Sequence, residues 1–92
     1  MKELRKLKTV TAVQGEPYIL RLVWKDGRTD LVEMSGVVGR LKAFKPLRDP
    51  RVFRKVRVIA EGLGIGWAND LDYSARSLQL LLKSQAHRKL SL

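Results

Sequence analysis

The chain is 92 residues long and carries 19 Lys and Arg residues against 9 Asp and Glu, a formal net charge of +10. This length fits a single domain, 1–92, with a core over about 9–86 and loosely ordered ends at 1–7 and 87–92. The absence of cysteine excludes disulfides and thiolate metal sites. The excess of positive charge favours an anionic partner, such as nucleic acid, an acidic protein or a membrane surface.

Two segments are candidates for a secretory signal or a membrane-spanning helix. The N-terminal residues 1–14 carry charge but continue into a stretch that is too short and too polar for a secretory signal. The Leu cluster at 78–82 is interrupted by Gln79 and is far shorter than a bilayer requires. We therefore predict a cytoplasmic protein with no membrane partner.

The first third of the chain has the pattern of three strands. Thr and Val dominate residues 8–14, and residues 18–25 alternate between two faces with period two. Asp26-Gly27 follows, a pair typical of a type I′ hairpin, and residues 28–34 form the weaker return strand. The connection at 35–39 has room for one turn of helix.

A basic segment follows, in which six triplets between Leu41 and Val58 read apolar residue, basic residue, then any residue. A three-residue repeat drifts by about 60° per triplet around a 3.6-residue helix, and Pro46 and Pro50 interrupt it. The segment must therefore break into short pieces. Asp49 followed by Pro50 is typical of a helix start, which predicts a short helix from Pro50 to about Lys55.

The last third predicts two strands and a long helix. Strands at 56–60 and 65–67 are separated by a glycine-rich turn, and Ser74 is a suitable cap for the helix. Leu80 falls opposite the predicted apolar face of that helix, which consists of Ala75, Leu78, Leu81, Leu82, Gln85 and Ala86. The predicted fold class is α+β: a small, mostly antiparallel sheet of about five strands with the C-terminal helix packed on one face.

The triplets allow three interpretations. Leu41, Phe44, Leu47, Phe53 and Val56 are candidate core anchors, and their basic neighbours could simply be the solvated side of the segment. Alternatively the cations form a surface that tracks phosphates with salt-sensitive affinity, or one that selects an acidic protein. We expect Phe44 and Phe53 to be buried rather than stacked on bases. The candidate anion or partner surface is Arg40, Lys42, Lys45, Arg48, Arg51, Arg54 and Arg57.

Other motifs do not reach the pattern of a catalytic, cofactor or metal site. The glycine run at 62–66 lacks the Lys-Ser or Lys-Thr of a phosphate loop, and Asp70-Leu71-Asp72 does not continue as a calcium loop. His87 has no Cys, second His or nucleophile motif to work with. We therefore expect no enzyme, no catalytic residue, no cofactor and no metal. Trp67 is interpreted as a packing residue, with the alternative that it borders a binding surface.

Several of these residues also carry a resemblance to a known family. Lys25-Asp26-Gly27-Arg28, then 32–35, and above all the stretch from Ile65 to Asp72 resemble the small bacterial family called domain of unknown function 2442. The resemblance covers roughly Thr9 to Leu82. Its most specific part begins at Trp67, where this chain has Ala68 in place of the usual Pro and Ala75-Arg76 in place of a common Pro-Glu. The residues that match the motif are Trp67, Asn69, Asp70 and Asp72.

The resemblance implies a small α+β domain without an established activity, often encoded beside another small protein in a toxin and antitoxin-like arrangement. Our first hypothesis is therefore a protein-interaction module, such as the antitoxin-like member of a small bacterial pair, which uses a sheet edge or the last helix. The alternative is nucleic-acid binding through Arg40 to Arg57. A homodimer through an exposed strand edge is a further candidate assembly.

Overall fold

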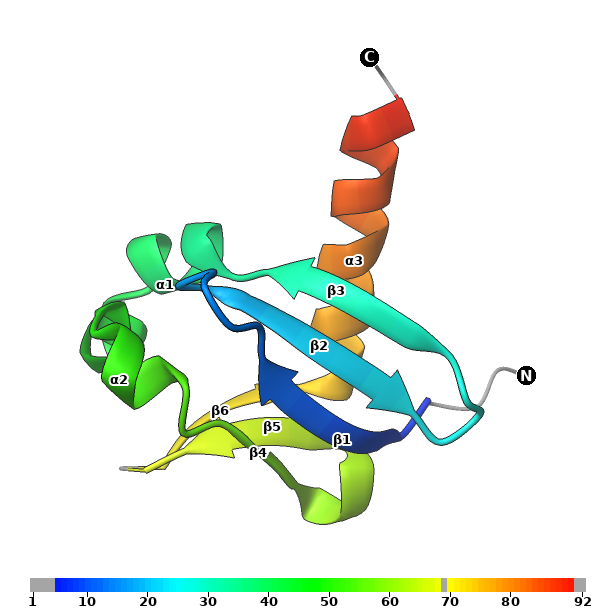
Figure 1. The fold of residues 1–92 in the computed structure, drawn as a ribbon, viewed down its shortest axis with the longest axis horizontal. Helices are drawn as coiled ribbons and strands as arrows, with labels where there is room; N and C mark the ends of the chain where they lie inside the picture. Colours follow the sequence, from blue (N-terminus) through cyan, green and yellow to red (C-terminus); the bar gives the residue numbers. More distant parts are fainter. Residues whose placement is uncertain (1–4, 69, 91–92) are drawn as a thin grey trace.

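Two three-stranded antiparallel sheets and a long C-terminal helix make up the molecule (Figure 1). This computed structural model describes residues 5–68 and 70–90. The predicted α+β class is confirmed, with six strands divided between two sheets instead of about five in one. Of the ends predicted to be loosely ordered, 1–7 and 87–92, residues 1–4 and 91–92 lie outside the described residues, whereas residues 87–90 continue the C-terminal helix.

The first sheet contains β1 (Leu7–Ala12), β2 (Ile19–Trp24) and β3 (Thr29–Glu33), in that spatial order. Burial alternates along β2 because one face of the sheet packs on the core and the other meets water. Leu20, Leu22 and Trp24 are thus buried, whereas Arg21 between them is exposed. Period-two patterning predicted β2, the Thr and Val content predicted β1, and the Asp26-Gly27 hairpin signal predicted β3.

The hairpin between β2 and β3 has a different turn from the type I′ turn that Asp26-Gly27 predicted. Gly27 has φ +93, but Asp26 does not have a positive φ. The Gly27 N–H donates to the Trp24 carbonyl at 2.9 Å, and the Trp24 N–H donates to the Arg28 carbonyl at 2.9 Å. These bonds define a three-residue loop in which Gly27 supplies the left-handed position of a bulge. The Asp26 carboxylate accepts the Arg28 N–H at 2.9 Å, which stabilises this longer loop.

The basic segment breaks into short pieces, as predicted: α1 (Ser35–Arg40) leads into a 3₁₀ helix, η1 (Lys42–Arg48), and then α2 (Pro50–Phe53). Asp49 caps α2 as expected, accepting the Arg51 N–H at 2.9 Å. The three-residue repeat fits η1 because a 3₁₀ helix has three residues per turn, so residues i and i+3 share a face. Leu41, ahead of η1, is not a core anchor, since 39% of it is exposed.

The second sheet contains β4 (Arg57–Ile59), β5 (Gly64–Trp67) and β6 (Leu71–Ser74), with β5 in the centre. The sequence pattern did not predict β6. Asp72 lies in this strand, opposite Gly66. The four residues of β6 are too few to produce a clear period-two signal.

The long helix α3 (Ala75–Leu90) begins where expected. The Ser74 hydroxyl accepts the Ser77 N–H at 3.0 Å, which satisfies an amide of the first turn. Leu78 is fully buried, and Leu80 on the opposite side is 59% exposed. The C-terminal half of α3 projects beyond both sheets (Figure 1).

The core extends further towards the N-terminus than predicted. Leu7, placed in the loosely ordered end by the sequence, starts β1 and is 1% exposed. It joins buried residues of both sheets and α3 in one continuous cluster, including Leu20, Ile65 and Leu78. β1 also lies against β4, so the first strand connects the two sheets.

The short turn η2 (Ala60–Gly62) between β4 and β5 depends on a glycine. Ala60, Glu61 and Gly62 all have positive φ, with Gly62 at +97. A Cβ added to Gly62 would lie 2.7 Å from the Leu7 carbonyl oxygen. Both the backbone conformation and the close approach of β1 therefore require glycine at this position.

Replacing Gly62 with alanine is predicted to destabilise the fold by about 2 kcal/mol or more, because a non-glycine residue is strained at this φ and its Cβ clashes with β1. Urea unfolding followed by circular dichroism measures the change. Gly39→Ala is the matched control, since no atom lies within 4 Å of a Cβ added in α1 and alanine favours helix. Equal unfolding midpoints for the two variants would contradict the explanation.

Candidate functional site

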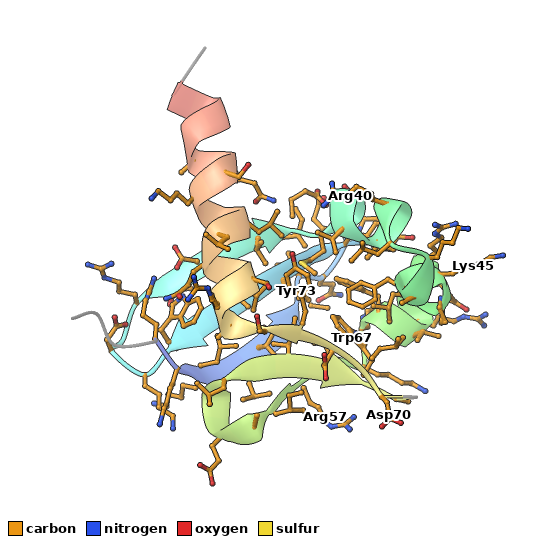
Figure 2. All side chains as sticks on the ribbon, turned by 180° about the vertical axis from the view of Figure 1, so that it is seen from behind. Arg40, Lys45, Arg57, Trp67, Asp70 and Tyr73 are labelled. Carbon is orange, nitrogen blue, oxygen red and sulfur yellow. The ribbon has the colours of Figure 1, made fainter. Side chains whose placement is uncertain are left out.

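The basic segment runs along one edge of a flattened molecule, whose extents are 36 × 36 × 24 Å. Figure 2 shows Arg40 above, Lys45 at the extreme end and Arg57 below, with the Lys45 side chain pointing away from the body. These three cations therefore follow the rim of the molecule and do not converge on one point. An extended anion could contact such an arrangement more readily than a compact ligand could.

The geometry of η1 separates apolar from basic side chains. Because residues three apart share a face of a 3₁₀ helix, Phe44 and Leu47 lie together, and so do Lys42 and Lys45. Phe44 and Leu47 are buried, whereas both lysines are exposed. With a rise of about 2 Å per residue, the two lysines stand about 6 Å apart along the helix.

An aromatic cluster holds this segment onto the second sheet. The indole N–H of Trp67 donates to the Phe53 carbonyl at 2.9 Å, in a buried position. The Trp67 ring centroid lies 5.8 Å from that of Phe53 and 5.9 Å from that of Phe44, and Tyr18 meets Phe53 edge-on at 5.4 Å. Trp67 is 2% exposed, so the structure places it in the packing role.

Arg48 has a structural role within the segment. Its Nε donates to the Val38 carbonyl at 3.3 Å and its Nη2 to the Gly39 carbonyl at 3.0 Å. These carbonyls lie at the end of α1, where a helix lacks internal donors. In addition, the Tyr18 hydroxyl donates to the Arg48 main-chain carbonyl. The guanidinium therefore joins α1 to η1, and two of its nitrogens already donate hydrogen bonds to main-chain carbonyls.

Arg51 is paired with the acid that caps α2. Its Nη2 lies 3.0 Å from Asp49 Oδ2, and its Nε donates to Oδ1 at 3.2 Å. The hydrogen bonds and charge of Arg51 hold the pKa of Asp49 below its ordinary value, and the carboxylate raises the pKa of Arg51. The pair is close to neutral, so Arg51 contributes little free positive charge.

The remaining cations form what we call the cationic rim. All are exposed, and within the described part of the chain none lies in an ion pair. Lys55 was not among the predicted site residues because it occupies the third position of its triplet; its exposure could be found only from the fold. The cationic rim consists of Arg40, Lys42, Lys45, Arg54, Lys55 and Arg57.

The lower end of the rim faces acidic residues. Arg57, Asp70 and Asp72 line a groove of about 210 Å³ together with part of Trp67. Asp70 is exposed and has φ +62, a left-handed conformation that aspartate tolerates in turns. Asn69 lies outside the described residues. Asp70 and Asp72 thus sit beside Arg57 and reduce the positive potential at that end of the rim.

The rim offers charge without an aromatic platform. Phe44 and Phe53 are buried, as expected, so neither can stack on a base. Among the described residues, no three His, Cys, Asp or Glu side chains gather as a metal site would require. The helices in the described ranges are also too short or too polar to cross a bilayer.

Comparison with known proteins adds to this geometry. A family model described as protein of unknown function (DUF2442) matches residues 10–81. The chain belongs to this family. The match confirms the resemblance carried by the hairpin and by the segment around Trp67.

A solved structure gives a second comparison. A protein of Nitrosomonas europaea named "Putative DNA Binding Protein" is 27% identical to this chain, with a TM-score of 0.78. The alignment covers 95% of this chain and 56% of that protein, so this DUF2442 domain spans little more than half of its relative's length. No curated protein matches the chain.

The Asp49–Arg51 pair predicts a pH-dependent contribution to stability. Because the folded-state pKa of Asp49 lies below its ordinary value of 3.8, its stabilising effect is present above that pH and disappears as the pH falls through the folded pKa. Asp49→Asn keeps a capping side chain but cannot titrate. Urea midpoints of the native protein should exceed those of the variant near neutral pH and converge with them in acid. A difference that does not change with pH would contradict this account.

Proposed function

We propose that this domain binds nucleic acid through the cationic rim, by contacts to the phosphate backbone. The observation that carries the proposal is the set of six exposed cations along one edge, without ion-pair partners among the described residues. A cation that is not already paired can replace a condensed counterion on a phosphate, and the release of that counterion drives binding. A net charge of +10 adds long-range attraction.

The expected mode of binding is insensitive to base sequence. The rim supplies Lys and Arg side chains from short helices, and the neighbouring aromatic rings are buried. Such a surface can neutralise phosphates, but it has little means of reading base edges. We expect affinity to fall steeply with salt and to differ little between duplexes of equal length.

The Nitrosomonas europaea relative gives limited support, through its name alone. This chain covers 56% of that protein, so the DNA binding named there could reside in the remaining part. The proposal for this chain therefore depends on its own rim.

We propose a binding role without catalysis, in the cytoplasm. Turnover of any substrate that is abolished by changing Asp72 or Trp67 would contradict the non-enzymatic part. The protein-interaction hypothesis, including the antitoxin-like pairing, is the second candidate. The specific observation that favours it is the outer edge of β3, which is an edge strand of the first sheet.

Reversing two charges of the rim tests the main proposal. Lys42→Glu combined with Lys45→Glu should weaken binding to a 20-base-pair duplex and reduce the slope of log K against log salt by about 1.8, or about 0.9 for each phosphate that the rim no longer neutralises. Fluorescence anisotropy across a salt series measures both quantities.

The matched control for this pair is Lys25→Glu combined with Lys83→Glu. It changes the net charge equally at exposed lysines away from the rim, so it should leave the slope nearly unchanged. If the native protein does not bind at low salt, or if both double variants weaken binding equally, the cationic rim is not the binding surface.

A gain of affinity is predicted for Asp49→Asn. The substitution removes the partner of Arg51 while leaving a capping side chain for α2, so the guanidinium becomes available to a phosphate. Duplex binding should tighten, and the salt slope should steepen by at most about 0.9. Glu61→Gln, at an exposed acid in the turn between β4 and β5, is the control with the same change in charge. An unchanged affinity for Asp49→Asn would place Arg51 outside the interface.

A further inference from the structure

A groove of about 550 Å³ lies between the outer edge of β3 and the face of α3. β3 is the edge strand of the first sheet, with β2 on its inner side. Thr29 and Leu31 line the groove from the strand, and Leu82 and Lys83 line it from the helix. None of these four residues belongs to the cationic rim, so the groove is a separate feature of the molecule.

The main chain of β3 points alternately into the sheet and into this groove. The Trp24 N–H bonds the Arg28 carbonyl and the Met34 N–H bonds the Tyr18 carbonyl, which sets the even-numbered residues of β3 to pair with β2. In an antiparallel sheet the residues that alternate with these, the odd-numbered residues of β3, direct their N–H and C=O groups away from β2. Those residues are Thr29, Leu31 and Glu33.

One of the three outward positions is already occupied by a side chain from α3. Gln85 Nε2 donates to the Glu33 carbonyl at 2.8 Å, and the Glu33 N–H donates to Gln85 Oε1 at 3.2 Å. The side-chain amide thus makes the pair of bonds that a neighbouring strand would make. Thr29 and Leu31 have no such partner within the described residues, and Leu31 is 56% exposed.

Arg5 adds a positive charge at the same groove. Its guanidinium lies 4.3 Å above the Trp24 ring, and its nitrogens are 3.7 Å from Asp26 and 3.8 Å from Asp30. These distances are too long for hydrogen bonds, and Arg5 Nε and Nη2 are buried without a partner. Those two nitrogens are shielded from solvent, but the Arg5 side chain as a whole is 28% exposed, so its positive charge can attract a ligand carboxylate at the accessible part of the guanidinium.

We infer that this groove binds an extended, acidic peptide segment of a partner protein, which adds as a fourth strand beside β3. The outward groups of Thr29 and Leu31 pair with the peptide main chain. Leu31 and Leu82 contact its apolar side chains, and an acidic side chain reaches Arg5 or Lys83.

The chemistry of the groove favours this occupant over two others. Nucleic acid has no main-chain amides to continue a strand ladder, whereas the β3 edge offers paired N–H and C=O groups. A second copy of the chain would bring another charge of +10 to the same place, which opposes edge-to-edge pairing. An acidic segment gains from that same charge. This inference does not depend on the proposed function of the cationic rim.

Selection from a phage-displayed library of random octapeptides on the full chain tests the inference. Leu31→Pro removes the outward N–H without removing a ladder bond to β2, and Lys83→Glu reverses the charge on the helix side. Peptides retained by the native protein should be acidic with alternating apolar residues. They should bind each variant at least about tenfold more weakly, as expected when one hydrogen bond or one charge pair is removed.

Spectroscopy locates the bound peptide. In a titration followed by ¹⁵N–¹H correlation spectra, the amides of Thr29 and Leu31 should shift most and gain protection from hydrogen exchange. Should Leu31→Pro fail to fold, Arg5→Lys is the second variant, because it keeps the charge and removes the guanidinium donors. Its affinity for the peptide should also fall.

Three outcomes would overturn the inference. The selection yields no peptide that binds the native protein more tightly than the variants. The amide chemical shifts that the peptide causes are confined to the cationic rim, or sedimentation shows a dimer that Leu31→Pro dissociates. Lys42→Glu combined with Lys45→Glu should leave peptide affinity within about twofold while weakening duplex binding. The two proposals can therefore fail independently.

Discussion

The buried indole of Trp67 is the contact on which the arrangement of the basic segment depends. Its N–H binds the Phe53 carbonyl, and its ring packs between Phe44 and Phe53. The helices of that segment have four to seven residues and would not persist alone in water. Packing on the second sheet must therefore offset both their conformational entropy and the repulsion among neighbouring cations.

This anchoring also decides which cations are free. A repeat of three residues matches a 3₁₀ helix, so the fold buries Phe44 and Leu47 and leaves Lys42 and Lys45 in water. The spacing of the triplets excluded a continuous α-helix and predicted a broken segment, whereas the 3₁₀ period became evident only in the structure. The same repeat serves core packing and surface charge, so the core-anchor interpretation of the triplets is compatible with either of the two surface interpretations.

Local patterns predicted the parts of the fold that local physics determines. Alternation identified β2, and the caps at Asp49 and Ser74 start their helices as expected. Tertiary contacts decided the rest. The four residues of β6 gain their strand structure by pairing with β5, and Arg51 is neutralised by a carboxylate whose orientation the sequence does not encode. The sequence suggested a sheet edge or the last helix as an interaction surface, but the groove between β3 and α3 could not be predicted, because it forms between elements about fifty residues apart.

The bond between Gln85 and Glu33 has a consequence for solubility. An uncovered edge strand is a template on which identical chains can stack without limit, as in amyloid. A side-chain amide that occupies one position of the edge shortens the stretch open to such stacking to Thr29 and Leu31. Among the described residues, the main-chain edge of β3 that stays open is therefore only about two residues long.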